Sequence, residues 1–310
     1  MHTTSPPSDI RRGAAAAAGS YLLWGILPIY WKTLDHVDSI ELMAHRLVWT
    51  LVVVLAYVAI VGELQSLRET WRSSTARRTH LANSALLTAN WGIFIWAINH
   101  EQIIEASLGY FLVPLLNAAV GRLIFHERLR RAQIVALALA TAGVAVMVFW
   151  VGALPWVSLG LAATWGCYGL NRKRSSASAS NGLAVETLYS LPFALLYLGW
   201  LAFDGGGAFG HTSRSTHLLI VGTGVISVVP LTLFAIGAKR LQMTTIGVLQ
   251  YIAPSCQFLI GWWVYHEPLS PFKAAAFVLI WAALGIYSAD AWHYGRRKTD
   301  GVTESRAGCR

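Results

Sequence analysis

The chain has 310 residues, of which 55% are hydrophobic and only 13% are charged, against about 25% charged in soluble domains. That composition excludes an ordinary soluble globule. Three scattered cysteines (Cys167, Cys256 and Cys309) exclude a disulfide framework and a zinc motif, and we expect no metal or cofactor. The net charge of +9 is compatible with nucleic acid binding, but in so apolar a chain basic residues mark cytoplasmic loops more often.

Apolar stretches follow one another along the whole chain, and a spanning helix needs about 20 such residues. The stretch at 132–171 is about twice that length, and the helix-stopping residues at 152–155 divide it. With that division we predict an all-α membrane protein of ten transmembrane helices and no large soluble domain. The stretches free of Asp, Glu, Lys and Arg are 13–31, 47–62, 79–100, 106–121, 132–171, 187–203, 215–238, 241–266 and 274–289.

Basic residues predict how these helices are oriented. With the N-terminus placed in the cytoplasm, 19 of the 24 Lys and Arg residues fall in cytoplasmic loops and tails, and Lys32, Arg214 and Lys273 fall outside. Arg46 and Arg122 lie within spans. This asymmetry predicts a multi-pass protein of the inner (plasma) membrane with cytoplasmic tails at 1–12 and 293–310.

An internal repeat divides the chain into two units. The string P-x6-G-x4-H-E-x-L occurs twice, 140 positions apart, and Trp24-Gly25 recurs 141 positions later as Trp165-Gly166. We therefore predict two five-helix repeats, 13–151 and 152–292, of which the second is inverted because five is an odd number. Inverted repeats are typical of secondary transporters, with the substrate site near the midplane. The repeated residues are Pro114, Gly121, His126, Glu127 and Leu129, and Pro254, Gly261, His266, Glu267 and Leu269.

The two halves, each with an H-E-x-L string after its fourth helix, resemble EamA domains of the drug/metabolite transporter superfamily. Further motifs resemble the RarD group of that family over about residues 13–292. The resemblance implies a ten-helix inner-membrane permease that exports small metabolites or drugs by alternating access. The motifs are Trp24-Gly25 with Pro28 and Tyr30-Trp31-Lys32, Glu41 with His45-Arg46 and Trp49, Asn90-Trp91 with Trp96-Ala97, and Ala106-Ser107-Leu108-Gly109-Tyr110 with Pro114-Leu115.

Ionisable residues inside spans are costly, so each is a functional candidate. Arg46 lies too deep to reach the interface easily, and it either pairs with a carboxylate such as Glu105 or binds an anionic part of a substrate. Glu41, His45 and Glu105 are the candidates for proton coupling. The alternatives are carboxylates placed at helix N-termini for Glu41 and Glu105, and a packing histidine for His45.

Polar and aromatic residues within the predicted spans are candidates for the substrate pathway. The repeat offset relates Tyr110 to Gln250 and Asn117 to Gln257, so polar positions recur in both halves. The alternative is that intramembrane amides join helices, at about 0.6 kcal/mol each. The candidates are Asn90, Trp91, Trp96, Tyr110, Asn117, Trp165, Tyr168, Gln250, Tyr251 and Gln257.

The repeated His-Glu pairs are not expected to bind metal. The predicted topology places His126-Glu127 at the cytoplasmic face and His266-Glu267 at the outer face, about 30 Å apart. No H-E-x-x-H spacing occurs. We interpret the pairs as a duplicated helix-end element.

The sequence thus predicts a secondary transporter for a small molecule, embedded in the lipid bilayer, without ATP use and without nucleic acid. A non-transporting receptor or scaffold and an uncoupled facilitator remain alternatives. A membrane-embedded enzyme would show a nucleophile with its base, and the sequence offers none.

Overall fold

The computed structural model describes residues 7–123, 126, 129–151, 154–238, 240–241 and 243–307, and all regular structure in this part of the chain is helical. The elements are α1 (Pro7–Lys32), α2 (Ser39–Ile60), α3 (Leu64–Arg72), α4 (Ser74–Asn99), α5 (Ile103–Leu123), α6 (Arg131–Val146), η1 (Met147–Val151), α7 (Trp156–Arg174), α8 (Ala179–Asp204), α9 (Arg214–Ala238), α10 (Met243–Leu249), α11 (Ile252–Leu259), η2 (Ile260–Val264) and α12 (Pro271–Ala307).

Eight helices of the described chain are long and apolar enough to cross a membrane, which makes it a multi-pass membrane protein. The sequence predicts ten. The two remaining predicted spans correspond to α7, whose last residues are Asn171-Arg172-Lys173-Arg174, and to the interrupted run α10–α11–η2. Neither is counted among the helices that are both long and apolar enough to cross a membrane. The reason is that α7 is less apolar than the eight helices and that the second run is broken into short pieces.

The helix ends follow from local side chains. The Asp38 carboxylate accepts from the backbone amides of Ile40 and Glu41 and so begins α2. Ser73 and Ser178 cap α4 and α8 in the same way. Gly205 ends α8 in the left-handed region at φ 72°, where glycine carries no steric penalty.

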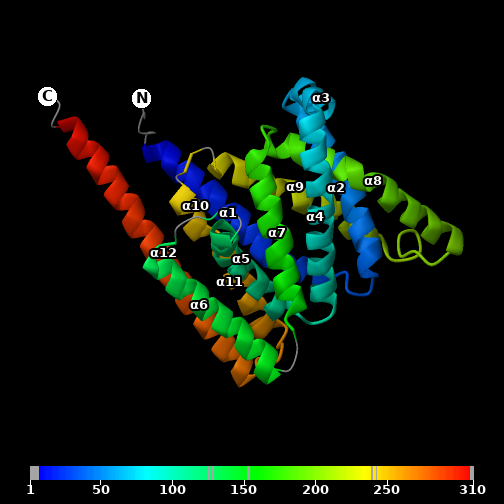
Figure 1. Cartoon of the computed structure of the whole chain (residues 1–310). Helices are drawn as coiled ribbons and strands as arrows, with labels where there is room; N and C mark the ends of the chain where they lie inside the picture. The colour runs from blue at the N-terminus through cyan, green and yellow to red at the C-terminus, as the bar shows by residue number, and fades with distance from the viewer. Residues whose placement is uncertain are drawn as a thin grey trace.

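Helices of the first half pack mainly on helices of the second half. α1 packs on α9 and α11, and α7, which has the place of α1 in the second predicted repeat, packs on α4 and α5. α2 packs on α9, and its counterpart α8 packs on α4; α2 also packs on α8, and α6 on α12. Exchanging the two halves leaves this pattern of contacts unchanged, and Figure 1 shows the paired α6 and α12 at one edge of the bundle.

The beginning of α1, the end of α12 and the short helix α3 lie on the same side of the bundle (Figure 1). α3 occupies what the sequence predicts as a basic loop, and none of its side chains is buried. α12 continues to Ala307, so the predicted tail at 293–310 is helical over most of its length. The predicted division at 151/152 adjoins residues 152–153, which lie outside the described residues.

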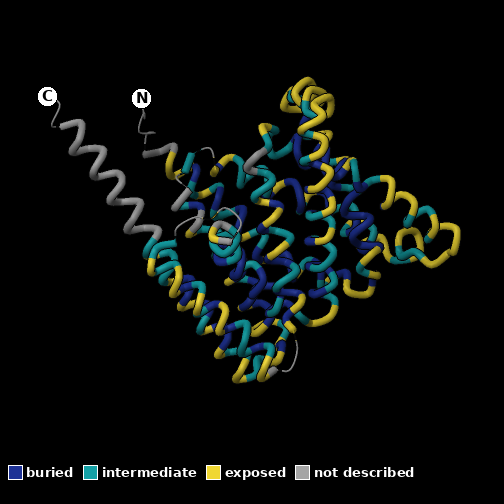
Figure 2. Tube along the Cα trace, viewed as in Figure 1, coloured by how far each residue is buried: buried dark blue, intermediate teal, exposed yellow. Residues whose placement is uncertain are grey.

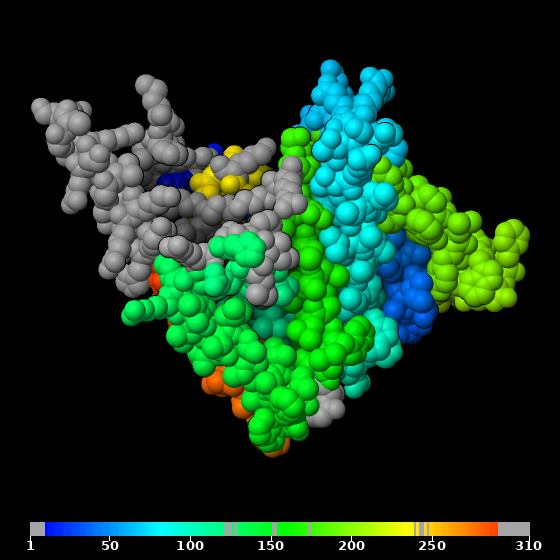
Figure 3. Space-filling model, in the orientation of Figure 1, coloured from blue at the N-terminus to red at the C-terminus, as the bar shows by residue number. Residues whose placement is uncertain are grey.

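The surface is apolar where a soluble protein would be polar. On α8, Phe193, Leu196 and Phe203 are 75%, 72% and 96% exposed, as expected of side chains that face lipid. Figure 2 shows buried residues concentrated along the middle of the bundle. On the face in Figure 3, α4 and α7 form a continuous surface between α6 and α8.

Candidate functional site

Arg46 lies about two turns inside α2 and is 3% exposed. Its guanidinium carbon lies 3.7 Å from the ring centroid of Trp91 on α4 and 5.1 Å from that of Trp31 on α1. Its Nε donates to the Ser227 hydroxyl on α9 at 3.1 Å. Helices from both halves therefore hold one buried cation, with two indole rings stabilising it by cation–π contact. We call Arg46, Trp31, Trp91 and Ser227 the Arg46 site.

A hydrogen-bonded chain extends from this site towards the second half. The Tyr110 hydroxyl on α5 donates to Asn90 Oδ1 at 3.2 Å, and Asn90 Nδ2 donates to Thr164 Oγ1 on α7 at 2.9 Å. The Tyr110 ring meets Trp165 edge to face, with centroids 6.4 Å apart. Tyr110 is also an electrostatic neighbour of Arg46. Four of the predicted pathway residues, Asn90, Trp91, Tyr110 and Trp165, are thus brought together around Arg46.

Predicted pathway residues related by the repeat contact equivalent places in the opposite half. Gln257 Nε2 on α11 donates to the backbone carbonyl of Trp24 at 3.1 Å. Asn117 on α5 lies against Gly166 on α7, where an added Cβ would stand 3.1 Å from Asn117 Oδ1. The oxygens of both amides are buried without a hydrogen-bond partner among the described residues. The repeat offset relates these two contacts, each of which joins a helix of one half to a helix of the other.

Glu41 and His45 lie one turn apart on α2, and His45 Nε2 is 3.7 Å from Glu41 Oε1. Glu41 Oε1 also accepts from the backbone amides of Ala208 and Phe209 in the loop after α8, at 2.7 and 3.2 Å. His45 packs on the Phe209 ring, with centroids 4.9 Å apart. In this structure two of the three predicted coupling residues, Glu41 and His45, therefore contact the loop between α8 and α9.

Glu105 does not lie at the Arg46 site. Its carboxylate accepts from the backbone amides of Val157 and Ser158 at the start of α7, and the Ser158 hydroxyl donates back to the Glu105 carbonyl at 2.6 Å. Among the described residues, no ion pair includes Arg46. The partner that the sequence suggested for Arg46 therefore caps another helix.

A second buried polar cluster was missed by the sequence prediction of site residues. Glu186 on α8 is 1% exposed, and its Oε1 lies 2.8 Å from His80 Nδ1 and accepts from Asn83 Nδ2 at 3.1 Å, both on α4. Its Oε2 accepts from the Tyr168 hydroxyl on α7 at 3.0 Å, and Arg172 Nη1 lies 3.7 Å from Oε1. We call these five residues the Glu186 network. The signal that could have found it is the repeat offset, because Glu186 stands 140 positions after Arg46.

Four further predicted pathway residues lie apart from Arg46. Trp96 stacks on His100 and leans on Trp156, at the end of α4. Tyr251 stands at the break between α10 and α11, and Gln250 precedes it and hydrogen-bonds with it. The sixth-span candidate Tyr168 belongs to the Glu186 network instead.

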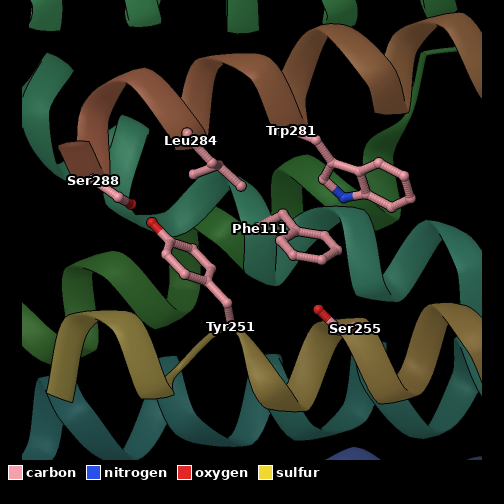
Figure 4. Close-up of a pocket in the computed structure, with 7 residues that line it drawn as sticks. Phe111, Tyr251, Ser255, Trp281, Leu284 and Ser288 are labelled. Carbon is pink, nitrogen blue, oxygen red and sulfur yellow. The ribbon is translucent and has the colours of Figure 1, made fainter. Parts of the chain in front are cut away.

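The break between α10 and α11 opens on a cavity of about 290 Å³ with mostly apolar walls (Figure 4). Phe111 and Tyr251, which stand 140 positions apart, stack across it with centroids 6.3 Å apart. The Tyr251 hydroxyl points toward Ser288 on α12. The cavity is lined by Phe111, Tyr251, Ser255, Trp281, Leu284, Gly285 and Ser288.

The second His-Glu pair forms a helix-end element. The backbone amides of Ile103 and Ile104, at the start of α5, donate to the two carboxylate oxygens of Glu267 at 2.7 and 2.8 Å. Burial raises the pKa of Glu267, and these two hydrogen bonds oppose the rise. His266 and His126 share a left-handed φ of 53°, while Glu127 lies outside the described residues.

The described residues hold no group of three or more His, Cys, Asp or Glu that could bind a metal ion. Their polar clusters consist of hydrogen-bond donors, aromatic rings and buried charges between helices. Such an arrangement can recognise a small molecule within the membrane.

Comparison with known proteins agrees with this architecture. The EamA-like transporter family matches residues 11–149 and 154–289. The uncharacterized transporter YojE of Bacillus subtilis is 40% identical over 91% of this chain and 95% of its own length. The protein RarD of Streptomyces exfoliatus is 38% identical over 94% and 92%, and the chloramphenicol-sensitive protein RarD of Pseudomonas aeruginosa is 34% identical over 88% and 92%. A solved crystal structure of a protein 21% identical covers 88% of this chain and 96% of its own with a TM-score of 0.57, which shows a shared fold.

The helical bundle, its apolar surface and its buried polar clusters define a multi-pass membrane protein of the transporter class. More narrowly, the chain belongs to the EamA-like transporter family, and its RarD relatives confirm the resemblance drawn from its motifs.

Proposed function

We propose that the chain is a secondary transporter that moves a small molecule across the inner membrane through a path between its two halves, and that it catalyses no reaction on that molecule. The observation that carries the proposal is the Arg46 site. Arg46 is a buried cation between indole rings and is held by helices from both halves. Burying a charge within a membrane is costly, so its presence there supports a functional role.

The proposal includes an arrangement of ten membrane-spanning helices in two inverted repeats, with both tails in the cytoplasm. The pairing of α1 with α11 and of α7 with α5 supports two repeats, as do the two separate family matches. The positions of the basic residues support the orientation. In alternating access, the contact between α1 and α11 and the contact between α7 and α5 would open in turn, each exposing the path to one side of the membrane, as inverted repeats allow.

Export and proton coupling are further parts of the proposal. Glu41, His45 and Glu105 stay the candidate coupling groups, since each is ionisable and lies where helices of different halves meet. The two carboxylates contact backbone amides and His45 packs on an aromatic ring. Protonation of a carboxylate would weaken its hydrogen bonds from amides, and protonation of His45 would change its contact with the ring. Proton uptake at Glu105 would loosen its hold on the start of α7.

The test is flux into proteoliposomes that contain the purified full-length chain. Radiolabelled amino acids, organic anions and chloramphenicol serve as probes, with and without an imposed pH gradient. The amphenicol is included because of the printed name of the Pseudomonas aeruginosa relative. Gradient-driven flux that Glu105→Gln removes supports coupling, whereas flux that ignores the gradient supports an uncoupled facilitator.

A receptor or scaffold is the competing function. It predicts that probes bind without crossing, so that binding measured on the same protein is accompanied by no flux in either direction. That result would overturn the transporter proposal.

A further inference from the structure

Arg46 carries a charge that the described part of the chain does not neutralise. Its side chain is buried, with 3% of the residue exposed, and no described carboxylate lies within 4.0 Å of it. A guanidinium stays protonated in proteins, so it cannot escape this cost by losing a proton. A buried charge without a counter-ion is strongly unfavourable, which calls for an anion from outside the chain.

Both acids that could have neutralised Arg46 are occupied elsewhere. Glu41 is bound to the amides of the loop after α8, and Glu105 is bound to the start of α7. Its polar neighbours are neutral: the Ser227 hydroxyl, which accepts a hydrogen bond from Nε, and the phenols of Tyr30 and Tyr110. The described residues near Arg46 therefore supply hydrogen-bond partners but no negative charge.

The guanidinium keeps hydrogen-bond donor capacity that no described residue uses. Its flat side lies against the Trp91 ring and Nε is used by Ser227, while Nη1 is buried with no hydrogen-bond partner among the described residues. The indole Nε1 of Trp31 is a second buried donor without a described partner. A flat anion with two acceptor oxygens matches the end of such a fork.

We infer that Arg46 binds the carboxylate of a small organic anion, and that this anion is the transported molecule. The inference rests on the proposed transport function. A carboxylate carries one negative charge and balances the single cation of the site, whereas a phosphate dianion would need further cations that Trp31, Trp91 and Ser227 do not supply. Neutral amides of the same shape bring no negative charge and replace one acceptor oxygen by a donor next to the guanidinium, so the site should reject them.

The experiment measures the melting temperature of the purified full-length chain with probes paired by shape: acetate against acetamide, and benzoate against benzamide. We expect the carboxylate of each pair to stabilise the chain and the amide to leave it unchanged. Arg46→Gln should abolish the stabilisation. Arg46→Lys, which keeps the charge but loses the fork, should weaken binding about tenfold or more. Arg214→Gln removes an exposed arginine and is the matched control.

Three results would overturn the inference: no stabilisation by either carboxylate, equal stabilisation by the amides, or stabilisation that persists in Arg46→Gln. Equal effects of chloride, nitrate and carboxylates would reduce the site to an unselective anion site and would also overturn it. If Arg46→Gln fails to fold, the paired probes on the native chain and on Arg46→Lys decide the matter alone.

Failure of this inference can be separated from failure of the transporter proposal. Flux of a neutral probe with no carboxylate binding would leave the transporter and remove the anion. Carboxylate binding that depends on Arg46, without flux of any probe, would leave the anion site and remove the transporter.

Discussion

Trp24 and Trp165, which begin the two copies of the repeat motif 141 positions apart, meet edge to face with ring centroids 6.4 Å apart. The contact joins α1 of the first half to α7 of the second. Gln257 holds the backbone of Trp24, and Asn117 lies against Gly166, the neighbour of Trp165. The duplicated residues thus form contacts between the two halves. A movement of one half relative to the other would change these contacts.

Because the two rings touch, their contributions to stability should not be additive. An edge-to-face aromatic pair contributes about 0.5–1.5 kcal/mol beyond burial. We expect Trp24→Leu and Trp165→Leu to destabilise the chain singly, and the double variant to lose less than the sum by about that amount. Thermal unfolding in detergent measures all four proteins. The pair Trp24 and Trp71, which share no ring contact in the structure, is the additive control, and additivity of Trp24 with Trp165 would contradict the contact.

The Glu186 network predicts a large loss when its charge is removed. Glu186→Gln leaves Arg172 without its carboxylate and replaces an acceptor oxygen by a donor that faces other donors. We expect a loss on the order of 3 kcal/mol. Glu63→Gln is the matched control, since Glu63 is only half-buried and accepts from the hydroxyls of Ser178 and Ser180. Equal melting temperatures of the two variants would remove the special role of Glu186.

Gly224 on α9 packs directly against the backbone of α2. A Cβ added there would lie 2.3 Å from the backbone oxygen of Trp49, and backbone cannot move aside as a side chain can. Gly224→Ala should therefore destabilise the chain by about 1–3 kcal/mol. Gly199→Ala on α8 meets nothing within 4 Å and should be neutral, or stabilising by up to about 1 kcal/mol through helix propensity. Thermal unfolding of both variants checks the contrast, which would fail if Gly224→Ala were the more stable.

The apolar stretches were sufficient to predict the eight helices that are long and apolar enough to cross a membrane. The sequence proposed Asn90, Trp91, Tyr110 and Trp165 as pathway residues, but it did not predict that they lie together near Arg46. The repeat offset alone relates Arg46 to Glu186, yet the two side chains carry opposite charges, so identity between the two halves does not point to the second cluster. Glu186 lies about two turns inside α8, so it is not a helix-terminal carboxylate.

The faces of the helices were harder to predict than the helices themselves. Trp96 and Tyr251 lie within predicted spans as expected, but they face a helix end and a separate cavity. In a membrane the outward face is as apolar as the inward face, so the sequence pattern does not tell which side of a span an aromatic residue takes. Only packing against neighbours decides it.

Glu267 predicts a dependence of stability on pH. Burial raises the pKa of this carboxyl in the folded chain above its unfolded value, so the folded state binds the proton more tightly. Its contribution to stability is therefore greatest below the ordinary carboxyl range and is lost as pH rises through the raised pKa. We expect the difference in melting temperature between the native chain and Glu267→Gln to become less favourable to the native chain as pH rises above the ordinary glutamate range. A difference that grows with pH would mean that the amides of Ile103 and Ile104 outweigh burial.

Labelling of single cysteines separates ten spans from eight. With the N-terminus inside, ten spans place His211 in the loop after α8 outside the cell, because α7 crosses; if α7 and α10–η2 did not cross, the same loop would lie inside. Gln65 on α3 lies inside in both cases. In a chain with Cys167, Cys256 and Cys309 replaced by serine, His211→Cys and Gln65→Cys are exposed sites for a membrane-impermeant maleimide on intact cells. We expect His211→Cys to react and Gln65→Cys to react only after permeabilisation. Protection of His211→Cys would show that α7 stays on one side, and with it the inverted repeat would fail, since the second unit would no longer cross the membrane five times.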